Sequence, residues 1–140
     1  MADDSLGERF RLPAAMHQAI VAHAQQEWPR ECCGVITGHN GLAEQLHALR
    51  NIAEGNRFYE IDPLQLMELE FQILPADESE IVSIYHSHPE SVAYPSKTDL
   101  EYAYWPEAIY LICSLENRDQ PYIRGFRLRD GAVTEVALGA

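Results

Sequence analysis

Apolar residues along the chain repeat with two different periods, and the changes between them predict the order of helices and strands. In residues 13–28 the apolar side chains fall three and four positions apart, which is typical of a helix packed on one face. A second helix is predicted from Asp62 to about Leu74, since Asp62 is a good N-cap and Pro63 suits the first helical position. Pro75 is expected to end it. Two apolar rows predict that this helix packs on a sheet: Leu66, Leu69 and Ile73, and Met67, Phe71 and Leu74.

Six other segments are short, rich in apolar residues and bounded by turn residues, so they are predicted as strands. Asn40-Gly41 and Asp130-Gly131 each lie between two of them, and both dipeptides favour tight hairpin turns. Since strands and helices alternate, we expect a single α/β domain over residues 1–140, a mixed sheet flanked by helices, with residues 1–11 loosely ordered. The predicted strands are 32–38, 42–50, 81–85, 108–115, 122–128 and 132–138.

Two histidines follow the apolar segment 81–85 directly. His86 and His88 are two residues apart, so on an extended segment their side chains point to the same side. A short helix is predicted to begin after Ser96, which would place Asp99 in its first turn. Two imidazoles and a carboxylate would form a three-ligand set of the kind that holds a catalytic zinc, with a fourth position left for water. The spacing therefore predicts a metal site on His86, His88 and Asp99.

Part of this motif also has a simpler interpretation. Ser96-Lys97-Thr98-Asp99 approximates a capping box, which by itself begins a helix and makes no site. A purely structural zinc site is another alternative, but such a site usually fills all four ligand positions with cysteine and histidine. The joint pattern of the histidines with Ser96 and Asp99 favours the catalytic metal site.

The joint pattern resembles the signature of the JAMM (MPN-plus) metalloprotease family: His-Ser-His-Pro at 86–89, six residues, then Ser96-x-x-Asp99. That family also has a glutamate far upstream, between a helix and a strand, and Glu31 occupies that place. The resemblance implies a curved mixed sheet flanked by helices, similar to the cytidine-deaminase sandwich. It also implies one zinc ion per chain on His86, His88 and Asp99.

The resemblance further implies roles for two residues that do not bind the metal. Glu31 would accept the proton of the attacking water and deliver it to the leaving amine. Ser96 would stabilise the oxyanion, a task that suits a fixed hydroxyl donor. Ser96 is also predicted to cap a helix, so the two roles are expected to coexist only if its hydroxyl has room to switch partner.

Within the family the chain is similar to a small, stand-alone prokaryotic branch, as Asn51-Ile52-Ala53, Phe58 and Asp62-Pro63 indicate. Members of that branch act on ubiquitin-like sulfur-carrier proteins, from which they remove a residue or peptide attached after the C-terminal Gly-Gly. The resemblance thus implies zinc-dependent cleavage of a peptide or isopeptide bond at such a tail. The alternative is a non-catalytic MPN-like binding scaffold whose metal site is occupied and inactive. The carrier protein, the leaving residue and a homodimeric state stay open.

Composition and missing motifs disfavour several other classes of protein. The net charge is −12, from 22 acidic and 10 basic residues. The sequence has no basic stripe, which disfavours nucleic-acid binding. No apolar run reaches the length of a membrane span, and no signal peptide is expected, so the chain is predicted to be cytoplasmic. Its three cysteines are expected to be packed thiols. A zinc deaminase would need His-x-Glu and Pro-Cys-x-x-Cys, and neither motif occurs here.

Overall fold

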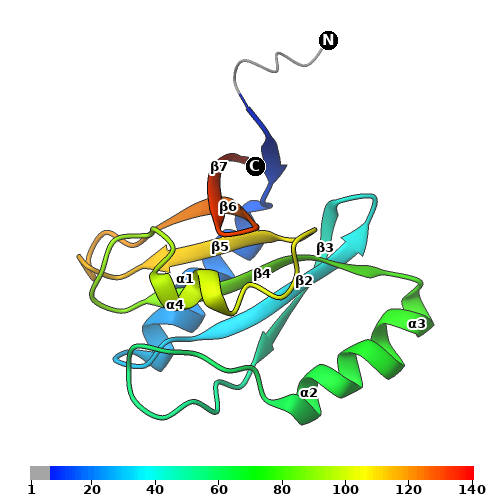
Figure 1. Cartoon of the computed structure of the whole chain (residues 1–140), viewed down its shortest axis with the longest axis horizontal. Coiled ribbons are helices and arrows are strands. Elements are labelled where there is room, and N and C mark those ends of the chain that lie inside the picture. Colours follow the sequence, from blue (N-terminus) through cyan, green and yellow to red (C-terminus); the bar gives the residue numbers. More distant parts are fainter. Residues whose placement is uncertain (1–6) are drawn as a thin grey trace.

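A curved sheet of seven strands forms the centre of the computed structural model, which describes residues 7–140 (Figure 1). Its strands lie in the order β1-β7-β6-β5-β4-β2-β3. β4 pairs in parallel with β5, β1 pairs in parallel with β7, and the other neighbours are antiparallel, which confirms the predicted mixed sheet. The strands are β1 (Arg9–Arg11), β2 (Cys33–His39), β3 (Leu42–Leu49), β4 (Glu80–His88), β5 (Ile109–Ser114), β6 (Tyr122–Arg129) and β7 (Ala132–Gly139).

Both predicted hairpin turns are present. Asn40 and Gly41 join β2 to β3, and Asp130 and Gly131 join β6 to β7, all four with positive φ. A two-residue turn of this kind needs positive φ at both central positions, which asparagine and aspartate tolerate and glycine adopts freely. The local dipeptides therefore determine where the chain reverses.

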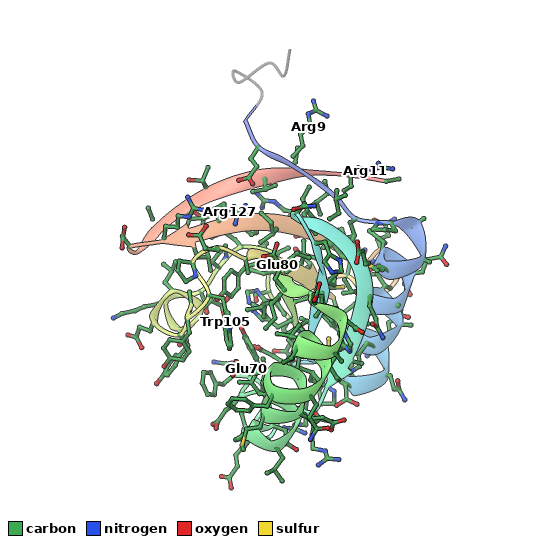
Figure 2. The ribbon with its side chains drawn as sticks, turned by 90° about the vertical axis from the view of Figure 1, so that its right-hand side faces the viewer. Arg9, Arg11, Glu70, Glu80, Trp105 and Arg127 are labelled. Carbon is green, nitrogen blue, oxygen red and sulfur yellow. The ribbon has the colours of Figure 1, made fainter. Side chains whose placement is uncertain are left out.

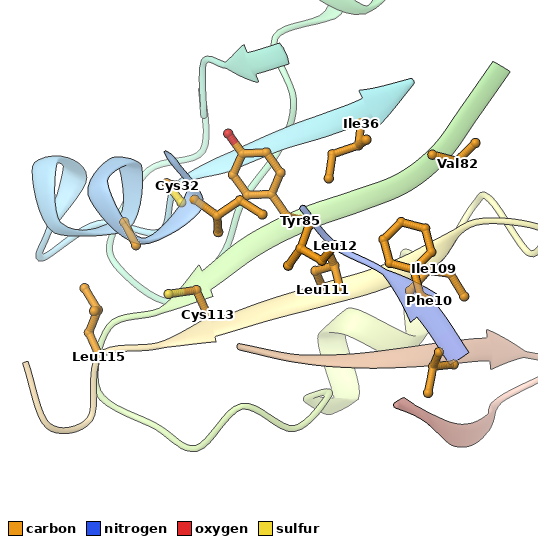
Figure 3. Close-up of a cluster of buried hydrophobic side chains, with 13 residues drawn as sticks. Phe10, Leu12, Cys32, Ile36, Val82, Tyr85, Ile109, Leu111, Cys113 and Leu115 are labelled. Atoms are coloured by element: carbon orange, nitrogen blue, oxygen red, sulfur yellow. The ribbon is translucent and has the colours of Figure 1, made fainter. Parts of the chain in front are cut away.

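Two apolar clusters lie on opposite faces of the sheet. The first contains Ile20 and Ala24 of α1 (Ala14–Glu27), which pack near Tyr85, Leu111 and Cys113 (Figure 3). The second cluster takes the alternate positions of the same strands, and it also buries Ile61 from the segment after β3. Its members include Leu69, Ile84, Tyr110, Ile112 and Phe126. Because side chains alternate along β4, His86 and His88 lie on the face of the second cluster.

The start of the described chain differs from the prediction of loose order over residues 1–11. Arg9–Arg11 forms β1, which pairs with the C-terminal strand β7, and Phe10 between them is buried. Arg9 and Arg11 are exposed, and both are labelled in Figure 2. A buried aromatic ring between two exposed arginines is the alternation of a strand with one buried face. Residues 1–6 lie outside the described part.

The predicted second helix exists but does not end at Pro75. It begins at Pro63, capped by Asp62 as predicted, and continues as α2 (Pro63–Glu68), the π-helical segment η2 (Leu69–Ile73) and α3 (Leu74–Asp77). In a regular α-helix the ring of Pro75 would clash with the carbonyl of Phe71. The wider π turn directly before it gives the ring room. No helix among residues 7–140 combines the length and apolar character needed to span a bilayer.

The two predicted apolar rows of this helix have different environments. Leu66, Leu69 and Ile73 pack in or against the second cluster, as predicted. Met67 and Phe71 of the other row are 53% and 71% exposed, so the prediction of a wide packed face was wrong for them. Leu74, the third member of that row, does pack against the second cluster. A single helix lying on a sheet buries one stripe of side chains, and Met67 and Phe71 lie outside it.

The three cysteines are buried and free, as packed thiols should be. Burial raises the pKa of Cys33 and of Cys113 to about 12, and it raises the pKa of Cys32 as well. A thiol with so high a pKa stays protonated at neutral pH and is a poor nucleophile.

Candidate active site

The two histidines lie within the last residues of β4 and not in a loop after it. This strand extends to His88, beyond the predicted 81–85, and it is paired with β2 on one side and β5 on the other. His86 is 0% exposed and His88 is 5% exposed. His86 is paired with Cys33 on one side and Ile112 on the other, and His88 is paired with Ser114, so main-chain pairing fixes where both residues lie.

Asp99 reaches both histidines from the first turn of α4 (Lys97–Glu101). Its Oδ1 lies 3.1 Å from His86 Nε2, and its Oδ2 lies 3.0 Å from His88 Nε2. The same carboxylate accepts a hydrogen bond from the main-chain N–H of Ser96 at 2.9 Å, and Ser96 Oγ accepts one from the N–H of Asp99 at 3.0 Å. The capping box and the cluster therefore coexist, and the cap fixes where the carboxylate points.

The geometry of the cluster fits a metal ion. The Nε2 atoms of His86 and His88 are 3.2 Å apart, and the ligand atoms of His86, His88 and Asp99 all lie within 4.8 Å of one another. His88 Nδ1 lies 2.8 Å from the main-chain oxygen of Val92, so in the neutral ring this nitrogen carries the hydrogen and the lone pair of Nε2 is free for a metal ion. Two imidazole nitrogens and a carboxylate that converge on one point are the donor set of a catalytic zinc site.

The charges in the cluster are strongly coupled. Burial by itself would raise the pKa of Asp99, but the charge of His86 and hydrogen bonds from both histidines hold that pKa well below its usual range. Burial by itself would lower the pKa of His88, yet Asp99 moves it upward. A carboxylate that stays ionised beside imidazole nitrogens creates a place for positive charge, which a divalent cation can supply.

Glu31 is brought to this cluster by strand pairing. Cys33 of β2 lies opposite His86, and Ser87 exchanges two hydrogen bonds with Cys32: its Oγ accepts from the Cys32 N–H at 2.8 Å, and its N–H donates to the Cys32 oxygen at 3.2 Å. One step further, Glu31 lies beside the end of β4. Its side chain lines the same cavity as His88. The volume of this cavity is about 610 Å³.

The electrostatic environment of Glu31 suits a proton carrier. The residue is 6% exposed, and its Oε1 is buried with no hydrogen-bond partner among the described residues. Burial raises the pKa of Glu31 to about 7, with the nearby His86 and His88 opposing the shift. A group with a pKa near the working pH can both accept a proton and release it. The prediction that Glu31 lies near the metal ligands is therefore supported by its position.

Ser96 lines the same cavity from the start of α4. Its hydroxyl oxygen accepts the capping hydrogen bond from Asp99. A hydroxyl accepts through a lone pair and still has its own hydrogen to donate. The hydroxyl therefore needs no switch of partner to serve as a cap and as a donor, because it accepts and donates through different sites.

Comparisons with known proteins agree with this geometry. The profile of prokaryotic homologs of the JAB domain matches residues 13–128, which is most of the chain. The chain belongs to this family. The CysO-cysteine peptidase of Mycobacterium tuberculosis is 37% identical over 124 residues, covering 87% of this chain and 84% of the relative. The desampylase of Haloferax volcanii is 40% identical over 117 residues, covering 79% and 84%.

Solved structures of other proteins share the fold. A protein of Desulfitobacterium hafniense superimposes with a TM-score of 0.82 at 26% identity, covering 93% of this chain and 91% of its own. A structure described as a JAMM metalloprotease-like zinc site superimposes with a TM-score of 0.57 at 15% identity, covering 95% and 98%. The second likeness shows the fold alone. The resemblance to the JAMM (MPN-plus) family and the predicted curved mixed sheet are confirmed.

Several residues that support this JAB site were not predicted from the sequence. Asn51 is buried and ties the segment after β3 to the site: its Nδ2 donates to the oxygens of Glu31 and Phe58, and its Oδ1 accepts from the N–H groups of Ala53 and Glu60. These bonds lie within 2.9–3.1 Å. The bond to Ala53 is local, but the bonds to Glu31, Phe58 and Glu60 span seven to twenty positions, so no local pattern indicates them.

The same segment supports His86 by stacking. The Tyr59 ring lies on the imidazole of His86 with centroids 4.5 Å apart and planes inclined by 22°. His86 Nδ1 has no hydrogen-bond partner in residues 7–140. The stacking on Tyr59 therefore restricts the His86 ring, whereas the main-chain oxygen of Val92 restricts the ring of His88. Tyr94, in the loop between Pro89 and Ser96, stacks edge-on against Phe126.

Proposed function

We propose that this chain is a zinc-dependent hydrolase that cleaves the peptide or isopeptide bond after the C-terminal Gly-Gly of a ubiquitin-like sulfur-carrier protein. The observation that carries the proposal is the convergence of His86, His88 and Asp99 beside the buried Glu31, which lines one open cavity together with His88 and Ser96. Three ligands and a nearby carboxylate are what hydrolysis by a catalytic zinc requires.

His86, His88 and Asp99 would hold the zinc. When bound, zinc supplies Lewis acidity to a water molecule and to the scissile carbonyl. Glu31 accepts the proton of the attacking water at a carboxylate oxygen and then gives it to the departing amine. Its burial favours the neutral form, so a proton taken up there is held until the amine needs it.

Ser96 donates its hydroxyl hydrogen to the oxyanion that develops on the substrate carbonyl. The hydroxyl is held in place because its oxygen is already engaged by the N–H of Asp99. A donor that is oriented before the reaction stabilises the developing charge without a cost of reorganisation. The helix cap therefore also prepares the oxyanion site.

The substrate class is supported by the relatives. One is named a CysO-cysteine peptidase and another a desampylase, and a third, 30% identical over 128 residues, is named a probable TtuB-protein conjugate cleaving protease of Thermus thermophilus. Each match covers at least four fifths of the relative's length. Activity on protein conjugates of this kind agrees with an open, solvent-accessible cavity.

The test is a cleavage assay on one purified sample. The protein is stripped with a chelator, reloaded with one equivalent of zinc, and incubated with a ubiquitin-like sulfur carrier that has one residue after its Gly-Gly. We expect mass spectrometry to show the loss of that residue only in the reloaded sample. Full zinc loading with no cleavage across a panel of such tails would refute the proposed substrate and favour a non-catalytic scaffold.

A further inference from the structure

The cavity beside the candidate metal cluster contains one arginine and no lysine in its described lining. Glu31, His88 and Ser96 line it, and so do Arg57 and Glu90. Glu31 and Ser96 have roles in the proposed reaction, whereas Arg57 has none so far. A guanidinium that opens onto a reaction cavity is a candidate for recognising an anionic part of the substrate.

Arg57 is the arginine that lines this cavity, and unlike several other arginines of the chain it has no carboxylate partner among the described residues. Arg50 pairs with Asp62 at 3.1 Å, Arg124 with Glu135 at 2.7 Å, and Arg127 with Glu8 at 2.7 Å. Within residues 7–140 no salt bridge engages Arg57, although the chain has 22 acidic residues and 10 basic ones. The guanidinium is exposed and therefore available to a ligand.

The chemistry of the proposed reaction indicates which anion could reach it. Glu31 gives a proton to the leaving amine, so that amine must come close to Glu31 inside the cavity. If the leaving group is a single amino acid, its free carboxylate is one carbon away from the amine and lies in the same cavity. Arginine matches a carboxylate with two parallel hydrogen bonds, and such charge-assisted bonds are among the strongest that side chains make.

Other leaving groups offer no such anion there. A C-terminal amide has lost the negative charge. An isopeptide-linked lysine leaves through its ε-amine, and its own carboxyl carbon is part of a main chain several bonds away. Arg57 would therefore distinguish leaving groups by the chemical group next to the amine.

We propose that Arg57 binds the free carboxylate of a one-residue leaving group, so that the enzyme selects a carrier extended by a single amino acid. This inference rests on the proposed function and names the part of the substrate that the cavity recognises. Arg57 lies in the exposed stretch between Ala53 and Tyr59, a stretch that Asn51 ties to the main-chain oxygen of Glu31. Asn51 also binds the oxygen of Phe58, the neighbour of Arg57, so these bonds keep Arg57 beside the cavity that Glu31 lines.

The test compares two substrates that differ only in charge. One is a carrier ending in Gly-Gly-Cys with a free carboxylate, and the other ends in the corresponding C-terminal amide. We expect the unmodified enzyme to show a kcat/KM about tenfold higher for the acid, the lower end of what a charge-assisted hydrogen bond contributes. Raising the salt concentration should reduce this ratio, since an exposed ionic contact is screened.

Substitution then assigns the preference to the arginine. Arg57→Gln should bring the ratio of acid to amide to about one, and Arg57→Lys should restore part of it because the charge returns without the planar fork. Arg11→Gln is the matched control: it removes the same charge from an exposed position of β1, which borders the start of β4 and does not line the cavity of Glu31 and His88, so it should leave the ratio unchanged. Thermal unfolding checks that each variant is folded.

The outcomes separate this inference from the proposed function. Equal cleavage of acid and amide by the unmodified enzyme would overturn the role of Arg57 while leaving the hydrolase intact. A preference that survives Arg57→Gln would overturn it as well. Cleavage of neither substrate by the zinc-loaded protein would refute the proposed function, and the inference with it.

Discussion

The two sides of the cavity are built in different ways. On one side, His86 and His88 are buried in a strand that is paired on both edges, and Asp99 is fixed by a reciprocal helix cap. On the other side, the segment 50–62 has little regular structure and depends on the side-chain hydrogen bonds of Asn51. The groups that would hold the metal lie on regular elements, Glu31 and Ser96 lie just before β2 and α4, and the arginine that would select the substrate lies on a tethered loop.

This division has a physical reason. A metal site tolerates little error in the position of its ligands, and regular main-chain pairing supplies that accuracy. A loop carries exposed side chains that can adapt to a substrate and can change without disturbing the core. We therefore expect substitutions on the rigid side to abolish activity and substitutions on the loop side to change affinity or selectivity.

The largest effect on turnover with the metal retained should come from Glu31→Gln. Removing the proton carrier should lower kcat about 100- to 10,000-fold, the usual contribution of general acid–base catalysis. Zinc content should stay at about one per chain, because Glu31 is not a ligand in the cluster. Glu54→Gln, in the exposed loop, is the control and should keep normal kcat. A fully active Glu31→Gln enzyme would contradict the assignment.

Ser96→Gly should separate the two tasks of Ser96. Glycine is an acceptable N-cap, so the free energy of unfolding should fall by only a few tenths of a kcal/mol, about what this replacement costs at other helix starts. The lost hydroxyl donor should still lower kcat on the order of 100-fold or more. Kinetics and chemical denaturation on the same sample measure both quantities. A normal kcat would leave Ser96 with the cap alone.

On the loop side, Asn51→Ala should weaken the attachment of the segment 50–62. The change deletes a side chain that makes four hydrogen bonds, and we expect it to lower the free energy of unfolding by about 2–4 kcal/mol. KM should rise more than kcat falls, and zinc should be retained. Asn56→Ala, in the exposed part of the same loop, should cost less than about 0.5 kcal/mol. A loss of zinc in Asn51→Ala would show that the two sides are not separable.

The smallest and most local expected effect is a change in the pKa of the Glu31 carboxyl. In the metal-free protein its carboxyl should titrate near a pKa of about 7, because burial favours the neutral form. Zinc should lower this pKa, since a nearby divalent cation favours the carboxylate. Carbon NMR of the side-chain carboxyl measures both values. An unshifted pKa in the metal-free protein would contradict the buried position of Glu31.

The contrast between the two sides also explains what sequence reasoning could predict. His86, His88 and Asp99 lie within fourteen residues, and their arrangement follows from a strand period of two and a helix cap, both local rules. Glu31 was found only through the family resemblance, because its place depends on the register between β2 and β4. Asn51, Tyr59 and Arg57 act across the fold, and no local pattern indicates them.

The errors in the fold have the same origin. Pro75 is a reliable helix breaker in a regular helix, and only the π turn before it allows the helix to continue. The strand Arg9–Arg11 is too short to be predicted locally, since it is stabilised by β7 from the opposite end of the chain. Met67 and Phe71 have the spacing of a packed row, but the sheet meets only the neighbouring stripe.

The central claim is that His86, His88 and Asp99 together hold one metal ion. The direct measurement is zinc per chain, by atomic emission after exhaustive dialysis, for the unmodified protein, His88→Ala and a control, His39→Ala. His39 is partly exposed and contacts Glu44 at 2.6 Å, outside the cluster. We predict about one zinc for the unmodified protein and for His39→Ala, and close to none for His88→Ala. Undiminished zinc in His88→Ala, or none in the reconstituted unmodified protein, would contradict the account.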